Sequence, residues 1–398
     1  MRPARPLMTA AALVTAALLT SPVLTACTPA SAGTKPSAGA VAEAEPKLPA
    51  PVIEASVAEG ATADYTAPVE VSVAGGRLES VTLTSGGKTL DAAPAVGELW
   101  TGPELAPLTT YTLAAAAVAP DGQQTTLQRT FTTAAPENEL TTDITPWGDQ
   151  VVGIGYPITV KLSHEVTGDA ERAAVQEGLV VSADKPIGPA SWAWISGREL
   201  QYRPKDFWPP NTRVTVDVKL AGVRAGEDLW GAKDRQVTFS TGRSQIIKVD
   251  AQTHMATVVR DGEVLKTLPT SLGKPGKNSV TRSGIKVIMD RNKSYRMRSD
   301  TLQNHSGADY DVTVPYALRL TWSGEFFHGA PWNTQIGRAN LSNGCYNLRV
   351  EDAKWLYDNV MIGDPVITTG TNRPMEEGNG LGGVWNVSWD RWTARSAT

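Results

Sequence analysis

Short runs of alternating apolar and polar residues, separated by turn residues, fill residues 51–243 of this 398-residue chain. Gly, Pro, Asp and Asn punctuate the runs, for example at Gly86-Gly87 and Pro120-Asp121-Gly122. Many short strands with regular turn signals predict β-sandwiches. The clearest runs are Val69–Val73, Ser80–Leu83, Tyr111–Leu113, Ile158–Leu162 and Arg213–Val218.

A weak internal repeat divides this β region into two modules. In each, a turn opens a strand (residues 107–113 and 210–216), and a strand centred on Phe131 or Phe239 ends the module. We therefore predict two immunoglobulin-like domains, at 51–137 and 138–243. Neither contains cysteine, so neither can form the intersheet disulfide of antibody domains.

The β pattern continues after residue 244. Runs at 245–250 and 255–260 alternate, and Asp261-Gly262 is a strong hairpin signal. One helix is predicted over 351–360, followed by a last strand at 364–368. The extension at 370–398 is Gly-rich and carries Trp385, Trp389 and Trp392, whose near-helical spacing favours packing on the preceding domains over sugar binding.

The N-terminus has the pattern of a secretion signal. Arg2 and Arg5 precede an apolar run that is shorter than the ~20 residues of a spanning helix. Leu24-Thr25-Ala26-Cys27 resembles a bacterial lipoprotein box, which implies cleavage after residue 26 and lipidation of Cys27. The alternative is an ordinary signal peptide with an incidental cysteine. Residues 27–50 have the composition of a flexible linker. We expect an extracytoplasmic protein, anchored in the cell membrane by lipid and reaching into the cell wall.

Composition excludes several classes of function. The formal charge is −4 and the chain has no block of basic residues, so nucleic acid is not an expected partner. Four scattered histidines lack metal-ligand spacing, and we expect no metal and no cofactor. Cys27 and Cys345 are the only cysteines, and a disulfide between two such distant segments is improbable.

Cys345 and His328 carry the candidate chemistry. A free thiol with a pKa of about 8.5 is only ~3% thiolate at pH 7, so a nucleophilic cysteine needs a base or a stabilised thiolate. His328 is the best candidate for that base. Gly344 permits a tight turn that leaves backbone amides free for an oxyanion. Taken alone the pair is a weak signal, because a buried inert cysteine is the default.

The surrounding residues make the signal specific. The segments His328–Trp332 and Ser342–Asn347 resemble the catalytic signature of bacterial L,D-transpeptidases, and the resemblance extends over residues 244–369. It implies a catalytic β-sandwich domain with one short helix, behind two immunoglobulin-like domains, as in multidomain actinobacterial members. Asn343 stands where many members have histidine, which puts in doubt a second imidazole but not the nucleophile.

The resemblance also implies a reaction and a site. Cys345 attacks a peptidoglycan tetrapeptide stem, D-alanine leaves, and an amine of a second stem resolves the thioester, with no need for ATP. His328 shuttles the proton and is oriented by the Gly329 carbonyl. Carbapenem-type β-lactams are the implied covalent inhibitors. The remaining implied site residues are Gly344 and Tyr316 at the oxyanion, Ser323, Gly324 and Asn347 at the donor stem, Trp332 and Met289 in the cleft, and Ser342 and Asn343 beside the nucleophile.

Several alternatives stay open at this level. Trp332 and Met289 have an alternative role as core residues, Tyr316 as a strand packing residue, and Asn347 as a turn residue. A carboxypeptidase would use the same site with water as acceptor. A non-catalytic wall-binding lipoprotein is a third possibility, against which the presence of both Cys345 and His328 argues.

Overall fold

The computed structural model describes residues 49–90, 97–276, 278–298 and 311–398, and these are mostly β. The predicted signal peptide, Cys27 and nearly all of the predicted linker lie outside the described residues. Three large clusters of buried apolar side chains follow one another along the chain, within 53–131, 140–239 and 247–366. The prediction of β-sandwiches that follow one another along a mostly β chain is confirmed as a fold class.

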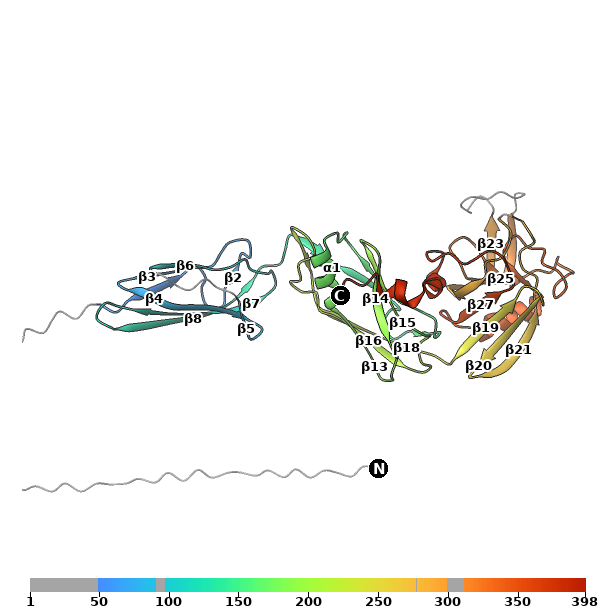
Figure 1. Cartoon of the computed structure of the whole chain (residues 1–398), viewed down its shortest axis with the longest axis horizontal. Helices are drawn as coiled ribbons and strands as arrows, with labels where there is room; N and C mark the ends of the chain where they lie inside the picture. Colours follow the sequence, from blue (N-terminus) through green and yellow to red (C-terminus); the bar gives the residue numbers. More distant parts are fainter. Residues whose placement is uncertain (1–48, 91–96, 277, 299–310) are drawn as a thin grey trace, which may run out of the picture. The chain divides into compact units, whose positions relative to one another are not determined.

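The first sandwich has two sheets. One contains β1 (Val52–Ala55), β3 (Glu70–Ala74) and β6 (Leu99–Thr101). The other contains β2 (Thr62–Ala63), β8 (Gln124–Thr133), β7 (Thr110–Val118), β4 (Arg77–Ser85) and β5 (Lys88–Thr89) (Figure 1). Alternate residues of β7 are buried, as its period-2 pattern predicts. The Tyr111 ring stacks on that of Phe131 in the core, with centroids 5.5 Å apart.

The second sandwich has the same two-sheet construction. One sheet contains β10 (Thr142–Thr145), β12 (Ile158–Leu162), β15 (Glu199–Pro204) and β14 (Ala190–Ser196). The other contains β11 (Val151–Val152), β18 (Arg235–Thr241), β16 (Arg213–Val218) and β13 (Leu179–Ala183), and β9 (Asn138–Leu140) pairs with β17 (Leu229–Gly231). Helix α1 (Asp169–Glu177) interrupts the β pattern, so the prediction of β structure throughout this region was wrong there. Its alanines and early acidic residues favour a helix.

The third part of the chain, residues 244–369, which the sequence predicts to be catalytic, also has two sheets. We call it the catalytic part. The first contains β21 (Glu263–Pro269), β20 (Met255–Arg260), β19 (Gln245–Asp250), β27 (Pro365–Thr369) and β22 (Gly284–Val287). The second contains β23 (Asp290–Arg298), β24 (Asp311–Arg319), β25 (Phe326–Gly329) and β26 (Tyr346–Leu348). Helix α2 (Val350–Asn359) packs on β24 and β25. The predicted hairpin between β20 and β21, the helix and the last strand are confirmed.

The C-terminal tail contacts both the second sandwich and the catalytic part. It contains the 3-10 helix η2 (Leu381–Asn386) and helix α3 (Trp389–Thr393). The indole N–H of Trp385 donates to the Gly155 carbonyl at 2.8 Å, and that of Trp392 donates to the Ser191 carbonyl at 3.0 Å. The tail tryptophans therefore have a packing role in this structure.

Arg203 of β15 is the polar centre of this contact. Its guanidinium lies 4.7–5.5 Å from the ring centroids of Trp385, Trp389 and Trp392, and one of its N–H groups donates to the Val387 carbonyl at 2.9 Å. Burial lowers the Arg203 pKa to about 10. Planar stacking of this kind is specific to a guanidinium among cationic side chains.

We expect Arg203→Ala to lower the free energy of unfolding by about 3 kcal/mol, because it removes several cation–π contacts and leaves buried carbonyls without a donor. Chemical denaturation measures the effect, and limited proteolysis reports whether the tail is released. The matched control is Arg198→Ala, an exposed arginine beside the β14–β15 turn. Equal stability of the two variants would contradict the assigned role of Arg203.

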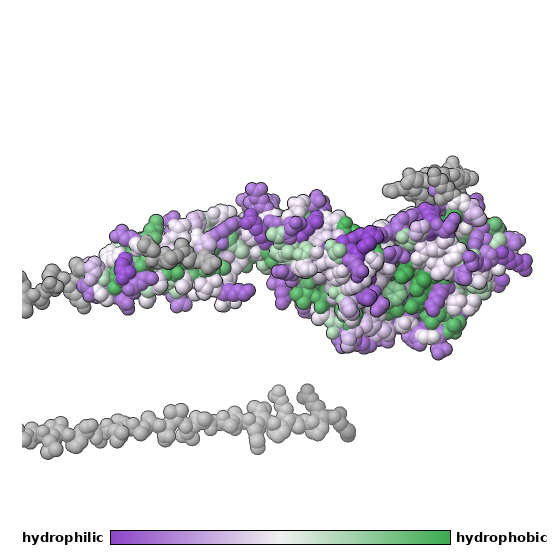
Figure 2. Space-filling model, viewed as in Figure 1, coloured by the Kyte–Doolittle hydropathy of each residue, from purple (hydrophilic) through white to green (hydrophobic). Residues whose placement is uncertain are grey.

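Hydrophilic residues cover much of the face drawn in Figure 2, with smaller apolar groups between them. This agrees with the alternating burial of the strands, which turn apolar side chains inward. Among the described residues, no helix has the length and apolar character needed to cross a membrane.

Candidate active site

The parallel pairing of β25 with β26 brings the two halves of the signature together. His328 is the partner of Asn347 in this register, and Phe327 is the partner of Tyr346. Cys345 directly precedes Tyr346, the first residue of β26, so it lies next to the strand that pairs with Phe327 and His328. Cys345 packs beside the apolar cluster that includes Phe326, which lies two residues before His328 in β25.

A hydrogen-bonded turn presents Cys345. The Ser342 hydroxyl donates to the Cys345 carbonyl at 2.6 Å and accepts the Gly344 N–H at 3.1 Å. The Thr281 hydroxyl donates to the Gly344 carbonyl at 2.8 Å. Gly344 has φ +126°, a backbone conformation that residues other than glycine rarely adopt. Asn343, at the tip of the turn, is exposed.

The Cys345 thiol lies against the turn before β25. Its Sγ donates to the Gly324 carbonyl, 3.6 Å away. Burial raises the pKa of the thiol to about 12, with a smaller opposing effect from the Phe326 N–H. The negative charge of Glu325 acts in the same direction as burial, and the positive charge of Arg319 opposes it. At neutral pH the thiol is therefore protonated.

The His328 imidazole is held by a backbone carbonyl. Its Nδ1 lies 3.0 Å from the Gly329 carbonyl oxygen, which can only accept. A neutral ring in this geometry carries its proton on Nδ1 and leaves Nε2 as a proton acceptor. Burial lowers the His328 pKa to about 4, so the imidazole is neutral at pH 7.

The resting site thus holds a neutral thiol and a neutral base. In this state the thiol and the imidazole do not form a resting thiolate–imidazolium pair. Burial disfavours both charged forms, because each would lose its hydration. Cys345 then becomes nucleophilic as the base takes its proton during attack.

We expect the pH profile of Cys345 acylation to be flat between about pH 6 and 8 and to fall only near pH 4. Protonation of His328 removes the base, and its pKa of about 4 sets that acid limb. Second-order acylation rates between pH 3.5 and 9, read by intact mass, measure the profile. An acid limb at pH 6–7 would contradict the neutral pair.

Other predicted residues lie around this pair. The exposed Trp332 ring has its centroid 6.0 Å from that of His328. Asn347 is buried and exchanges backbone hydrogen bonds with Ser271. Ser323 and Gly324 form the turn that faces Cys345.

Two predicted residues belong to other surroundings. Met289 is buried in the apolar cluster that includes Val384 and Trp385 of the tail. The Tyr316 ring packs against Tyr357 of α2, with centroids 5.8 Å apart. Both side chains thus have the packing contacts that the sequence analysis left open as their alternative role, and their predicted places in the cleft and at the oxyanion stay predictions. The Gly344 N–H already donates to the Ser342 hydroxyl, so it is not available to bind an oxyanion.

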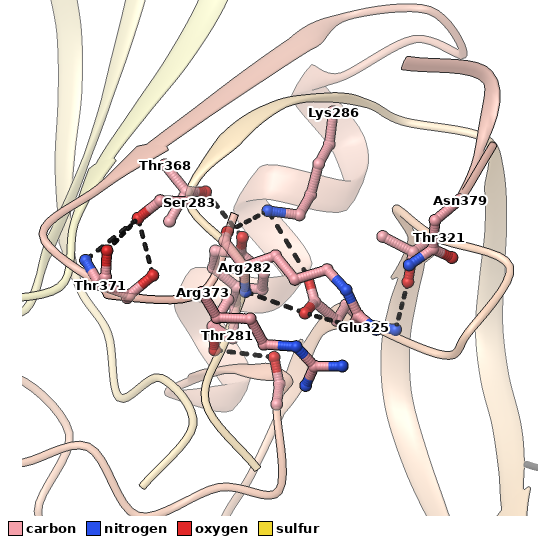
Figure 3. A network of polar contacts seen from close by, with 12 residues as sticks. Thr281, Arg282, Ser283, Lys286, Thr321, Glu325, Thr368, Thr371, Arg373 and Asn379 are labelled. Atoms are coloured by element: carbon pink, nitrogen blue, oxygen red, sulfur yellow. Dashed lines mark hydrogen bonds and ion pairs between the residues drawn. The ribbon is translucent and has the colours of Figure 1, made fainter. Parts of the chain in front are cut away.

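A buried ionic network of Arg282, Lys286 and Glu325 was not predicted (Figure 3). One oxygen of Glu325 accepts from the backbone N–H and the guanidinium of Arg282, both at 3.0 Å. The other oxygen lies 3.5 Å from the fully buried ammonium of Lys286, which also donates to the Arg282 carbonyl. Burial lowers the Lys286 pKa. The mutual contacts of these residues have no signal in the sequence.

The chemistry available at the site is acyl transfer. Within the described residues, no group of three or more His, Cys, Asp or Glu side chains is arranged to hold a metal ion. A thiol, a neutral imidazole with a free Nε2 and a turn of backbone amides are the components of a cysteine acyltransferase.

Comparison with known proteins specifies the class. The L,D-transpeptidase catalytic domain family matches residues 244–368, and the bacterial Ig domain family matches residues 60–224. L,D-transpeptidase 2 of Mycobacterium tuberculosis is 35% identical over 363 residues, which cover 88% of this chain and 85% of that protein. L,D-transpeptidase 5 of the same species is 33% identical, with 83% of this chain and 73% of that protein covered. A solved L,D-transpeptidase in complex with imipenem has a TM-score of 0.50 and 32% identity, and covers 59% of this chain and all of the other.

These similarities extend over the sandwiches as well as the catalytic part. The chain belongs to the L,D-transpeptidase family.

Proposed function

We propose that this L,D-transpeptidase cross-links peptidoglycan stem peptides with Cys345 as nucleophile and His328 as general base. The observation that carries the proposal is the 3.0 Å contact between His328 Nδ1 and the Gly329 carbonyl oxygen. Because this carbonyl holds Nδ1, Nε2 is left as the proton acceptor, and the pairing of β25 with β26 brings His328 beside the strand that directly follows Cys345. No carboxylate is required as a third member, because a carbonyl already fixes the ring.

The reaction proceeds in two acyl transfers. In the first, Sγ of Cys345 attacks the carbonyl of the bond before the terminal D-alanine of a tetrapeptide stem, and its proton passes to His328 Nε2. The C–N bond breaks, the imidazolium returns the proton to the departing amine, and a thioester remains. In the second, an amine of another stem attacks the thioester, and Cys345 recovers its proton through His328. The product joins the third residues of two stems.

A backbone donor stabilises the oxyanion that forms in each transfer. We assign this role to the Cys345 N–H, since the Gly344 N–H donates to the Ser342 hydroxyl and the Tyr316 ring packs on Tyr357 of α2. Ser323 and Gly324 form the donor side of the site, because their turn touches the thiol. Asn347 and the exposed Trp332 ring border it on the side of His328.

Incubation with a disaccharide-tetrapeptide tests the proposed function. We expect a cross-linked dimer and free D-alanine, both resolved by mass spectrometry. Free tripeptide without dimer would show a carboxypeptidase instead, and the absence of any turnover would favour a non-catalytic scaffold. A relative has been solved with imipenem, and we propose that carbapenems acylate Cys345 here, adding one drug mass.

We also propose that the protein acts outside the cytoplasm, tethered to the membrane by lipid on Cys27. The lipoprotein box and the preceding apolar run support this anchor. Acyl chains at Cys27 would hold the protein at the outer membrane face, and the linker and sandwiches would separate the active site from it.

We expect Cys27→Ser to move most of the protein from the membrane fraction to the soluble fraction, because the acyl chains that anchor it are lost. Fractionation and immunoblotting of cells measure the distribution. Thr28→Ser, a neighbouring change that keeps the thiol, serves as control. An unchanged distribution of Cys27→Ser would overturn the lipid anchor.

A further inference from the structure

The C-terminal tail contacts the active-site turn directly. The side chain of Asn379 bonds Ser323 twice: its Oδ1 accepts the Ser323 backbone N–H at 2.9 Å, and its Nδ2 donates to the Ser323 hydroxyl at 2.9 Å. The two residues are 56 positions apart in the sequence. Figure 3 shows Asn379 beside Thr321, on the same side of the buried ionic network.

The next tail residue is seated closely against the same turn. Gly380 has φ +123°, and a Cβ at this position would lie 2.9 Å from the Leu320 carbonyl oxygen and 3.4 Å from the Thr321 Cα. Only glycine allows so close an approach of two backbones. The contact of Asn379 is therefore built into the path of the tail and is not an incidental surface bond.

A second tail residue reaches the other end of the turn through the network. The Glu376 carboxylate accepts from Arg282 Nε at 2.5 Å and from Asn379 Nδ2 at 2.9 Å. Arg282 in turn binds Glu325, the residue after Gly324. The tail thus holds the turn at Ser323 directly and at Glu325 through Arg282.

The turn forms the protein surface beside the Cys345 thiol. The Gly324 carbonyl, between the two held positions, accepts from Cys345 Sγ at 3.6 Å. The turn's own closing bond, from the Gly324 N–H to the Thr321 carbonyl, is long at 3.3 Å. The Glu325 N–H also closes the turn by donating to the Thr321 hydroxyl at 2.8 Å, but the Ser323 N–H between these positions is held from outside the turn, by Asn379.

We propose that Asn379 is a positioning residue for the donor stem, which acts by fixing the main chain of Ser323 and Gly324. This inference rests on the proposed function, in which that turn forms the donor side of the site. It makes the tail a part of the substrate-binding wall in addition to its contact with the second sandwich.

Three variants test the proposal in full-length protein with the disaccharide-tetrapeptide as donor. Asn379→Ala removes both bonds to Ser323, and we expect kcat/KM to fall about tenfold, mainly through KM, as for the loss of one to two hydrogen bonds. Asn379→Asp keeps an acceptor for the Ser323 N–H but opposes the Glu376 carboxylate, so it should also be impaired. Adding Glu376→Gln removes that repulsion and should restore most of the lost kcat/KM.

The control is Asn372→Ala, which removes an exposed amide from the same tail. We expect its KM and kcat to equal those of the wild type. Melting temperatures within 2–3 °C for all variants, about the shift that 1 kcal/mol produces in a chain of this size, would separate positioning from unfolding.

The proposal is overturned if Asn379→Ala matches Asn372→Ala in KM, or if Glu376→Gln does not improve Asn379→Asp. It is equally overturned if kcat falls alone in proportion to lost folded protein. A wild-type protein that produces no cross-linked dimer would instead reject the proposed function, so the two failures are distinguishable.

Discussion

Cys345→Ala is expected to abolish cross-linking, with a loss of roughly 10⁴-fold or more in turnover of the tetrapeptide. No other described cysteine exists to replace it. The change removes one half-buried sulfur beside Phe326 and Gly324, so the fold should persist. Product formation by mass spectrometry measures the loss.

Cys345→Ser is the matched control for this prediction. A hydroxyl can keep the hydrogen bond to the Gly324 carbonyl, yet it is a far weaker nucleophile than sulfur beside the same base. We expect it to be as inactive as the alanine variant while it retains the wild-type melting temperature. Cross-linking by either variant at more than about 1% of the wild-type rate would contradict Cys345 as nucleophile.

His328→Gln is expected to slow acylation of Cys345 by a carbapenem about 10³-fold at pH 7. A glutamine amide is of similar size and can donate to the Gly329 carbonyl, but it cannot take the thiol proton. The pKa of Cys345, about 12, leaves very little thiolate to react unaided. Intact-mass measurement of the acylation rate gives the effect.

The pH dependence of the variant adds a sharper criterion. Below the thiol pKa, the thiolate fraction rises about tenfold with each pH unit, so the variant's rate should rise about 100-fold from pH 7 to 9. The wild-type rate should change little, because His328 stays neutral over that range. His164→Gln, an exposed histidine of the second sandwich, is the control. A variant rate within a few-fold of wild type at pH 7 would refute His328 as the base.

Alternation and turn residues were sufficient to predict several of the strands. The runs at 158–162 and 213–218 became β12 and β16, and Asp261-Gly262 joins β20 and β21 as expected. Period-2 burial determines such strands locally, so the sequence alone reveals them. Helix α1 was not predicted because it is short and lies between segments with the alternating pattern of strands.

The chemistry of the site was predictable only as far as the motifs extended. Cys345 and His328 follow from the family signature, but their pKa values depend on burial that assembles from distant segments. The hydrogen bond of the Gly344 N–H was not predictable either, because its acceptor is the Ser342 hydroxyl and the bond forms only in the folded turn.

The contributions of the tail were beyond sequence reasoning for the same reason. Asn379 meets Ser323 across 56 residues, and Met289 is covered by tail residues that follow it by about a hundred positions. Neither pair has a periodicity or a spacing that points to contact. Such pairings are set by the whole fold, and their partners are single polar or apolar residues of ordinary type.

The mass of the acylated enzyme tests the central claim most directly. Wild-type protein is mixed with disaccharide-tetrapeptide, quenched in acid within a turnover, and analysed intact and after digestion. We predict a mass increase equal to the donor minus D-alanine, located on the peptide that contains Cys345. Release of D-alanine with an adduct on another residue, or with no adduct under conditions that trap a carbapenem on Cys345, would contradict it.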